Sequence, residues 1–178
     1  MARKYNPKPR QAVALYNFLK DKDPKTGAEI GVFWGETFFY LLDNLPDLKL
    51  IGVDLWKPVT WGDKSDEGYR EYSEFPMEKY YRDVITRAKN YNERAIIYKE
   101  DSVKAADKEI DRSLSFIFID GDHTKEGVER DLLAWMPKIK PGGYLMGHDI
   151  HMPGVKAVVD KYIKQYKELD NYVWVSQI

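Results

Sequence analysis

Several short apolar runs along the chain are each followed by residues that can bind a ligand or move a proton. These residues are Glu29-Ile30-Gly31-Val32-Phe33-Trp34-Gly35, Asp54, Asp101-Ser102, Asp120-Gly121-Asp122-His123 and His148-Asp149. In an open parallel sheet, ligands bind beyond the carboxyl ends of the strands, where the strand order reverses. If the runs are parallel strands, these residues meet at one edge of the sheet and form one site.

The first two groups predict a nucleoside ligand. Gly31 and Gly35 let the backbone turn tightly and approach a ligand closely. Asp54 follows Glu29 by about 25 positions, the separation at which a carboxylate accepts hydrogen bonds from ribose hydroxyls. The loop lacks the third glycine of a dinucleotide fingerprint. Glu29 would repel a pyrophosphate but suits an ammonium group, so a dinucleotide is the less favoured ligand.

The three histidines of the chain all follow the fourth and fifth apolar runs, as His123, His148 and His151. An imidazole with a pKa near ~6.5 can take the proton of an attacking hydroxyl at neutral pH. We therefore expect His123 and His148 to be catalytic together with Asp120. The alternative is a metal ion that lowers the pKa of the hydroxyl directly. Because the chain has no cysteine, oxygen and imidazole are the ligands left for such a metal.

The elements that position these groups follow a repeated strand-then-helix pattern, which predicts a parallel sheet covered on both faces. The expected strands are residues 28–32, 50–56, 95–98, 114–120, 143–149 and 172–176, and the expected helices are 11–21, 37–45, 77–90, 127–138 and 155–169. Residues 57–75 are polar, contain aromatic side chains and exceed the usual loop length, so we expect a lid. The predicted fold is α/β: one Rossmann-like domain spanning residues 1–178.

Composition limits the partners. The 178 residues include 28 basic and 29 acidic side chains, and 43% are hydrophobic, which is enough for one core in one domain. A near-neutral chain has no global field to attract nucleic acid or an anionic membrane. No apolar run approaches the ~20 residues that span a bilayer, and the first residues lack the apolar region of a signal peptide. We therefore expect a cytoplasmic protein.

The motifs in order resemble a known family. Glu29-x-Gly31-x-x-x-Gly35, Asp54, Asp101-Ser102, Phe118-Ile119-Asp120-Gly121-Asp122-His123 and Lys140-Pro141-Gly142-Gly143-Tyr144-Leu145 are similar to those of class I S-adenosylmethionine-dependent methyltransferases. Within them the chain resembles the small bacterial group with Asp-Gly-Asp-His and Gly-His-Asp motifs. The likeness covers about residues 26–158. It implies a Rossmann-like fold, S-adenosylmethionine as cofactor and a small-molecule acceptor.

The resemblance also implies roles for individual residues. Glu29 and Gly31 would line the methionine end of the cofactor, Asp54 would hold the ribose, and Asp101 with Ser102 would meet the adenine. Trp56 would lie against the adenine face. The full set of expected cofactor-binding residues is Glu29, Gly31, Gly35, Asp54, Trp56, Asp101, Ser102 and Asp120.

Some relatives that methylate hydroxyl groups bind a divalent metal, and the matching positions here are Asp120, His148 and Asp149. Magnesium prefers oxygen ligands, so Asp122 or His151 is an alternative to His148. Simpler interpretations remain open: Asp54 and Asp101 as caps at strand ends, Asp120 and Asp122 as caps of the following helix, and tryptophans that only pack.

The sequence thus predicts a methyltransferase that acts on a hydroxyl of a small molecule. Two alternatives stay open: a catalytically inactive S-adenosylmethionine-binding or regulatory protein, and a nucleotide-sugar or dinucleotide enzyme on a similar sheet. We expect no nucleic acid or membrane partner. A homo-oligomer could complete the acceptor pocket, since the chain has little length beyond the cofactor-binding sheet.

Overall fold

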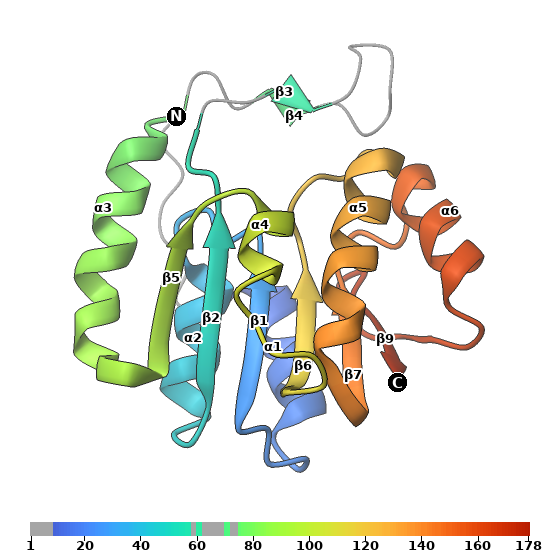
Figure 1. Ribbon diagram of the computed structural model, residues 1–178, viewed down its shortest axis with the longest axis horizontal. Coiled ribbons are helices and arrows are strands. Elements are labelled where there is room, and N and C mark those ends of the chain that lie inside the picture. Colours follow the sequence, from blue (N-terminus) through green and yellow to red (C-terminus); the bar gives the residue numbers. More distant parts are fainter. Residues whose placement is uncertain (1–8, 58–59, 62–69, 72–74) are drawn as a thin grey trace.

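The computed structural model describes residues 9–57, 60–61, 70–71 and 75–178. In this part of the chain a seven-stranded sheet lies between two layers of helices (Figure 1). Its strands are β1 (Thr26–Ile30), β2 (Lys49–Asp54), β5 (Ala95–Lys99), β6 (Leu114–Ile119), β7 (Ile139–Gly147), β8 (Lys167–Glu168) and β9 (Trp174–Gln177). The short strands β3 (Thr60–Trp61) and β4 (Arg70–Glu71) form a separate antiparallel pair.

The strand order β5-β2-β1-β6-β7-β9-β8 places the reversal between β1 and β6. The first five strands of this order are parallel, whereas β9 and β8 run antiparallel to their neighbours. Ile30 at the end of β1 pairs with Val53 of β2 and with Ile119 of β6. This register brings Gly31, Asp54 and Asp120 to neighbouring strand ends, as the motif positions predicted.

The helices are α1 (Arg10–Leu19), α2 (Glu36–Asn44), α3 (Met77–Ala88), α4 (Ser102–Ala106), α5 (Lys125–Trp135) and α6 (Pro153–Tyr162), with 3-10 turns at Lys89–Arg94 and Met136–Lys138. In Figure 1, α4 and α5 lie in front of the sheet, and α1 and α2 lie behind it.

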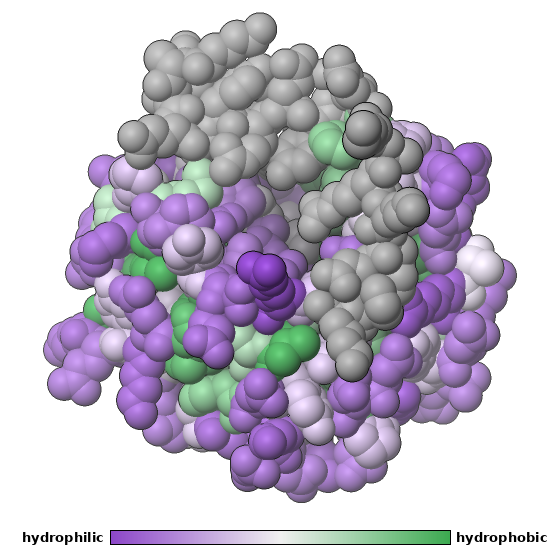
Figure 2. Space-filling view, turned by 180° about the vertical axis from the view of Figure 1, so that it is seen from behind, coloured by the Kyte–Doolittle hydropathy of each residue, from purple (hydrophilic) through white to green (hydrophobic). Residues whose placement is uncertain are grey.

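Alternation along β6 divides the core between these two layers. Phe116 and Phe118 pack with side chains of α1, α2 and α3. Ile117 and Ile119 pack with side chains of α4, α5 and α6. All six residues of β6 are buried, which explains why every one except Ser115 is apolar. The surface on the side opposite Figure 1 is mostly polar, with apolar residues in small separate areas (Figure 2).

The structure confirms the predicted fold class: a Rossmann-like sheet, mostly parallel and flanked by helices. The structure differs from the sequence prediction in one helix that ends earlier and in short elements that were not expected. The expected helix 155–169 ends at Tyr162, because Ile163 turns to an extended backbone, and residues 167–168 form the edge strand β8. Helix α4 was not predicted, since five residues are too few for a helical period to show.

The expected lid falls largely on residues 58–59, 62–69 and 72–74, which lie outside the described residues. Among the described residues no helix is long and apolar enough to cross a membrane.

Candidate functional site

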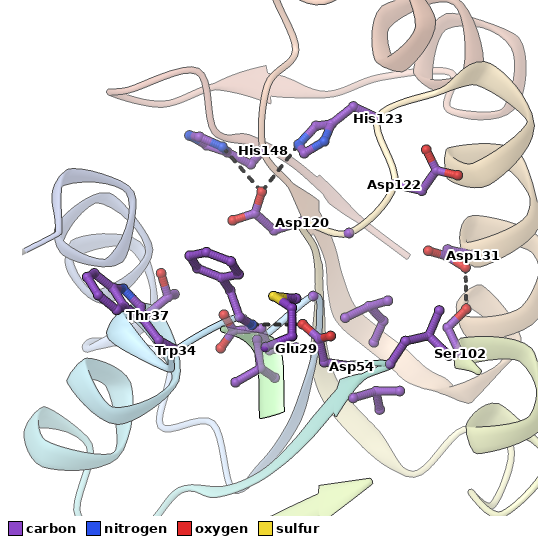
Figure 3. A pocket seen from close by; sticks show the side chains of 18 of the residues that line it. Glu29, Trp34, Thr37, Asp54, Ser102, Asp120, Asp122, His123, Asp131 and His148 are labelled. Atoms are coloured by element: carbon purple, nitrogen blue, oxygen red, sulfur yellow. Dashed lines mark hydrogen bonds and ion pairs between the residues drawn. The ribbon is translucent and has the colours of Figure 1, made fainter. Parts of the chain in front are cut away.

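A cavity of about 480 Å³ opens at the carboxyl ends of β1, β2 and β6 (Figure 3). Its volume is within the range usual for sites of small ligands. Most of the residues that the sequence singled out line it: Glu29, Gly31, Asp54, Ser102, Asp120, Asp122, His123, His148 and Asp149. Three predicted residues, Gly35, Trp56 and Asp101, do not line it among the described residues.

Gly31 allows β1 and β6 to approach each other at the floor of the cavity. Its φ is +93°, and a Cβ at this position would lie 2.2 Å from the backbone oxygen of Asp120. Its N–H donates to the backbone oxygen of Val53 at 2.8 Å. A side chain here would be strained and would collide with backbone, so only glycine fits. Gly35 also has a positive φ of +84°, but its hydrogen atoms face the ring of Phe39 and not the cavity.

Asp54 ties together the loops that follow β1 and β2. Its Oδ2 accepts from the N–H of Phe33 at 2.8 Å, and its Oδ1 accepts from the N–H of Trp56 at 2.7 Å. Burial raises the pKa of the Asp54 carboxyl, and these backbone donors oppose the rise. Asp54 also lines the cavity, so a ligand bound there would meet its carboxylate.

Trp56 packs beneath the loop. Its side chain is only 2% exposed, its Nε1 donates to the backbone oxygen of Phe33, and its ring lies 5.1 Å from that of Tyr81. The structure therefore places this ring in the core, in agreement with the alternative that it only packs.

Glu29 is a buried acidic residue near the end of β1. It is 2% exposed, lines the cavity, and its Oε2 has no hydrogen-bond partner among the described residues. Burial raises the pKa of Glu29 well above its usual value, and the charges of Asp120 and Asp54 raise it further. Leaving a buried carboxylate oxygen unpaired is costly, so a positively charged ligand group at this point would remove that cost.

Asp120 at the end of β6 and Asp149 after β7 enclose two imidazoles. Nε2 of His123 lies 2.8 Å from Asp149 Oδ2 and 3.6 Å from Asp120 Oδ1. Nδ1 of His148 lies 3.4 Å from a carboxylate oxygen of each aspartate, while its Nε2 lies 3.0 Å from the backbone oxygen of Asn171. Figure 3 shows both rings turned toward Asp120.

The carboxylates control the protonation of the two imidazoles. Burial acts to lower the pKa of His123, but contacts with Asp120 and Asp149 outweigh it and raise this pKa to about 9. For His148 too, burial acts to lower the pKa, but contacts with the same two aspartates raise it to about 10. Burial acts to raise the pKa of Asp120 and Asp149, but contacts with the two histidines leave both lowered. In this arrangement both imidazoles are protonated at neutral pH.

Ligand atoms of Asp120, His123 and Asp149 all lie within 4.8 Å of one another. The predicted metal set held His148 in place of His123, and His148 is not part of this convergent group. Both ring nitrogens of His123 are buried, and neither makes an aligned hydrogen bond to a described residue. His151 is more remote: its ring is half exposed, stacks near Tyr172 and lies 3.7 Å from Asp149 Oδ1.

Asp101 and Ser102 begin helix α4 and have different roles. The Asp101 side chain accepts from the N–H groups of Val103 and Lys104 and so caps the helix, as one of the simpler interpretations held. Ser102 lines the cavity, and its Oγ donates to Asp131 Oδ1.

Sequence reasoning missed Asp131, a cavity-lining residue of α5 that is 2% exposed. It shares a buried helix face with Val128, Leu132 and Trp135. An acidic residue on an otherwise apolar helix face is rarely buried without a reason. That pattern was visible in the sequence and could have identified it.

We expect Asp131 to make stability depend on pH. Burial raises its pKa to about 6, against a partial opposing effect of Ser102. The folded protein therefore binds this proton more tightly than the unfolded chain, and stability falls as pH rises from about 3.8 to about 6. Relative to wild type, Asp131→Asn should gain about 3 kcal/mol across this window and nothing further above it. Urea unfolding of both proteins between pH 4 and 8 measures the difference; a difference independent of pH would contradict it.

The parallel sheet with its cavity at the reversal of strand order, and an acidic group at each adjacent strand end, are the features of a class I methyltransferase domain. A family model described as "Methyltransferase domain" matches residues 28–150. The match covers more than half of the chain, and the chain belongs to this family.

Solved structures with low sequence identity share the fold. The O-methyltransferase from Bacillus cereus in complex with SAH has a TM-score of 0.64 and 16% identity, over 99% of this chain and 84% of that one. The SAH-bound methyltransferase PaMTH1 from Podospora anserina has a TM-score of 0.66 and 11% identity, over 93% and 76%.

Among curated proteins, y4gI from Sinorhizobium fredii is 25% identical over 130 residues, or 71% of this chain. The matched region is 13% of the length of that protein.

Proposed function

We propose that the protein binds S-adenosylmethionine in this cavity and transfers its methyl group to a hydroxyl of a small-molecule acceptor. The observation that carries the proposal is Glu29, a buried cavity-lining acid beside Asp54 and Asp120. One of its oxygens has no hydrogen-bond partner among the residues that the structure describes. A methionine ammonium and a sulfonium are the cationic groups that such an acidic floor would hold. The known complexes of fold relatives with SAH support the same ligand.

The ligand would extend along the strand ends. Its ammonium group would pair with Glu29, its ribose hydroxyls would donate to the carboxylate of Asp54, and its adenine would lie toward Ser102. The cavity lining also includes Ile30 and Leu55, which are apolar and would suit a flat base.

S-adenosylmethionine supplies a methyl group on a sulfonium, which is a good leaving group, so the protein's task is to position the acceptor and help its hydroxyl lose a proton. The protonated imidazoles of His123 and His148 both contact Asp120. They therefore lie near the end of the cavity where the methionine part of the ligand would bind. A protonated imidazole cannot accept a proton, but it donates hydrogen bonds that stabilise an oxyanion. Both ring nitrogens of His148 and Nε2 of His123 already contact protein oxygens. The two residues would therefore act through their positive charge, which favours an ionised acceptor hydroxyl once its proton has passed to water.

We further propose that a divalent cation binds to Asp120, His123 and Asp149. The convergence of their ligand atoms supports the fit. The cation would displace the proton of His123, because a ligating imidazole is neutral. Two carboxylates with an imidazole suit manganese, iron or zinc better than magnesium. When bound, such an ion would lower the pKa of a coordinated hydroxyl, and the three residues would orient the acceptor.

Titration calorimetry with S-adenosylmethionine and S-adenosylhomocysteine tests the binding proposal. Wild type should bind both saturably, and Asp54→Asn should bind at least about tenfold more weakly, since hydrogen bonds to a charged group are lost. Asp47→Asn, an exposed aspartate paired with Lys25, is the matched control and should bind as wild type does. Wild type that binds neither compound, or that binds a nicotinamide dinucleotide instead, would overturn the proposal.

A further inference from the structure

We infer, on the basis of the proposed function, that Asp131 is a specificity-determining residue that recognises the amino group of adenine. Ser102 holds its carboxylate in place for this contact.

In the described part of the chain, the hydrogen bonds of Asp131 involve only one of its two oxygens. Oδ1 accepts from Ser102 Oγ and, at 3.4 Å, from Nη2 of Arg130. Oδ2 lies 3.5 Å from the point that a Cβ on Gly121 would occupy, on the side of a cavity-lining glycine. Figure 3 shows Ser102 bound to one carboxylate oxygen while the other is directed toward the cavity.

The carboxylate is held rigidly. Ser102 is the first residue of α4, and its backbone oxygen accepts from Nε1 of the fully buried Trp135 at 3.1 Å. Trp135 is on the same helix as Asp131, one turn further along. The two helices therefore fix Ser102 and Asp131 relative to each other, and a preorganised acceptor costs little to align with a ligand.

The position suits the edge of a purine. Glu29 and Asp131 lie on opposite sides of Asp54 in Figure 3, so a ligand with its ammonium at Glu29 and its ribose at Asp54 directs its base toward Asp131. The exocyclic amine of adenine donates hydrogen bonds, and a carboxylate oxygen only accepts them when ionised. Burial raises the pKa of Asp131 only to about 6. The ionised carboxylate, which accepts hydrogen bonds, therefore dominates at and above neutral pH.

A purely structural role for the Asp131 carboxylate would have a different consequence for ligand binding. If Asp131 served only to anchor Ser102, the base of the ligand would not matter to it. The contact with the amine makes the affinity depend on a single group of the ligand, which is the property to measure.

The experiment compares S-adenosylhomocysteine with its analogue that carries hydrogen in place of the adenine amine, at pH 8, by calorimetry. Wild type should bind the analogue at least about tenfold more weakly, because the Asp131 oxygen is then buried without its donor. In Asp131→Ala the ratio of the two dissociation constants should fall to threefold or less. Each ratio is measured on one protein sample, so a partly unfolded variant does not change it.

Two further variants complete the test. Asp131→Asn keeps the shape and a neutral acceptor, and should give an intermediate ratio; it decides the matter if Asp131→Ala does not fold. Glu129→Gln removes a charge from the same helix, at a residue paired with Lys161 outside the cavity, and should keep the wild-type ratio. Equal affinities in wild type, or an unchanged ratio in both Asp131 variants, would overturn the inference while leaving the proposed function standing. Wild type that binds neither compound would overturn both.

Discussion

Replacing Glu29 with glutamine is expected to weaken binding of S-adenosylmethionine by about 10- to 100-fold, since the ammonium loses a charge-assisted contact. The same replacement should make the ligand-free protein more stable at alkaline pH. Glu29 has a pKa well above its usual value through burial and through repulsion from Asp120 and Asp54. The folded state therefore binds its proton more tightly than the unfolded state, and wild type loses stability as pH rises toward that pKa. Glutamine has no proton to lose.

Calorimetry and thermal unfolding between pH 5 and 9 measure both effects. Binding by wild type should release a proton and weaken as pH falls, because the cation pairs with the ionised carboxylate. Glu29→Gln should release fewer protons, and its melting temperature should exceed that of wild type by a few degrees at pH 9. Glu168→Gln, at an exposed residue of β8, is the control. A variant that loses both affinity and stability would show that Glu29 has a structural role instead.

The loss of affinity and the gain of stability in Glu29→Gln reflect a general trade-off. Binding sites concentrate groups that are in an unfavourable state until the ligand is bound. Glu29, Asp54 and Asp120 repel one another, yet all three are kept at adjacent strand ends. The core could hold apolar residues at these positions at lower cost. On the proposed function, a cation that binds among them would offset this cost.

The sequence was sufficient for the fold and for the position of the site, because both depend on local patterns. Continuous apolar runs identify strands that are covered on both faces, as in β6. In parallel strands, residues at the carboxyl ends must meet, so Glu29, Asp54 and Asp120 could be grouped without knowledge of side-chain contacts.

Side-chain direction could not be predicted in the same way. Trp56 follows Asp54 directly, but a φ of 43° turns its ring into the core beside Tyr81. Asp101 and Ser102 are adjacent, yet one caps α4 and the other faces the cavity. The protonation of His123 depends on carboxylates from two strands, so an ordinary imidazole pKa was the wrong starting value for this residue.

Replacing Asp149 with alanine is expected to weaken binding of Mn²⁺ by at least about 100-fold while S-adenosylhomocysteine binding changes by less than threefold. Asp149 Oδ2 is the oxygen that lies 2.8 Å from His123 Nε2 and 3.4 Å from His148 Nδ1, so its loss removes a carboxylate ligand and leaves two imidazoles beside one carboxylate. Asp149 lies on the β7 side of the cavity, away from Asp54. The loss of free Mn²⁺ signal in electron paramagnetic resonance measures the metal affinity directly and needs no knowledge of the acceptor.

His151→Ala is the matched variant, because His151 also contacts Asp149, at 3.7 Å, yet is half exposed and outside the convergent group. It should bind Mn²⁺ within about threefold of wild type, whereas His123→Ala should resemble Asp149→Ala, since each removes one of three ligands. Wild type that takes up no Mn²⁺, Zn²⁺ or Fe²⁺ would refute the metal site. The two imidazoles would then act on the acceptor hydroxyl through their positive charge alone, because their raised pKa values keep both protonated at neutral pH.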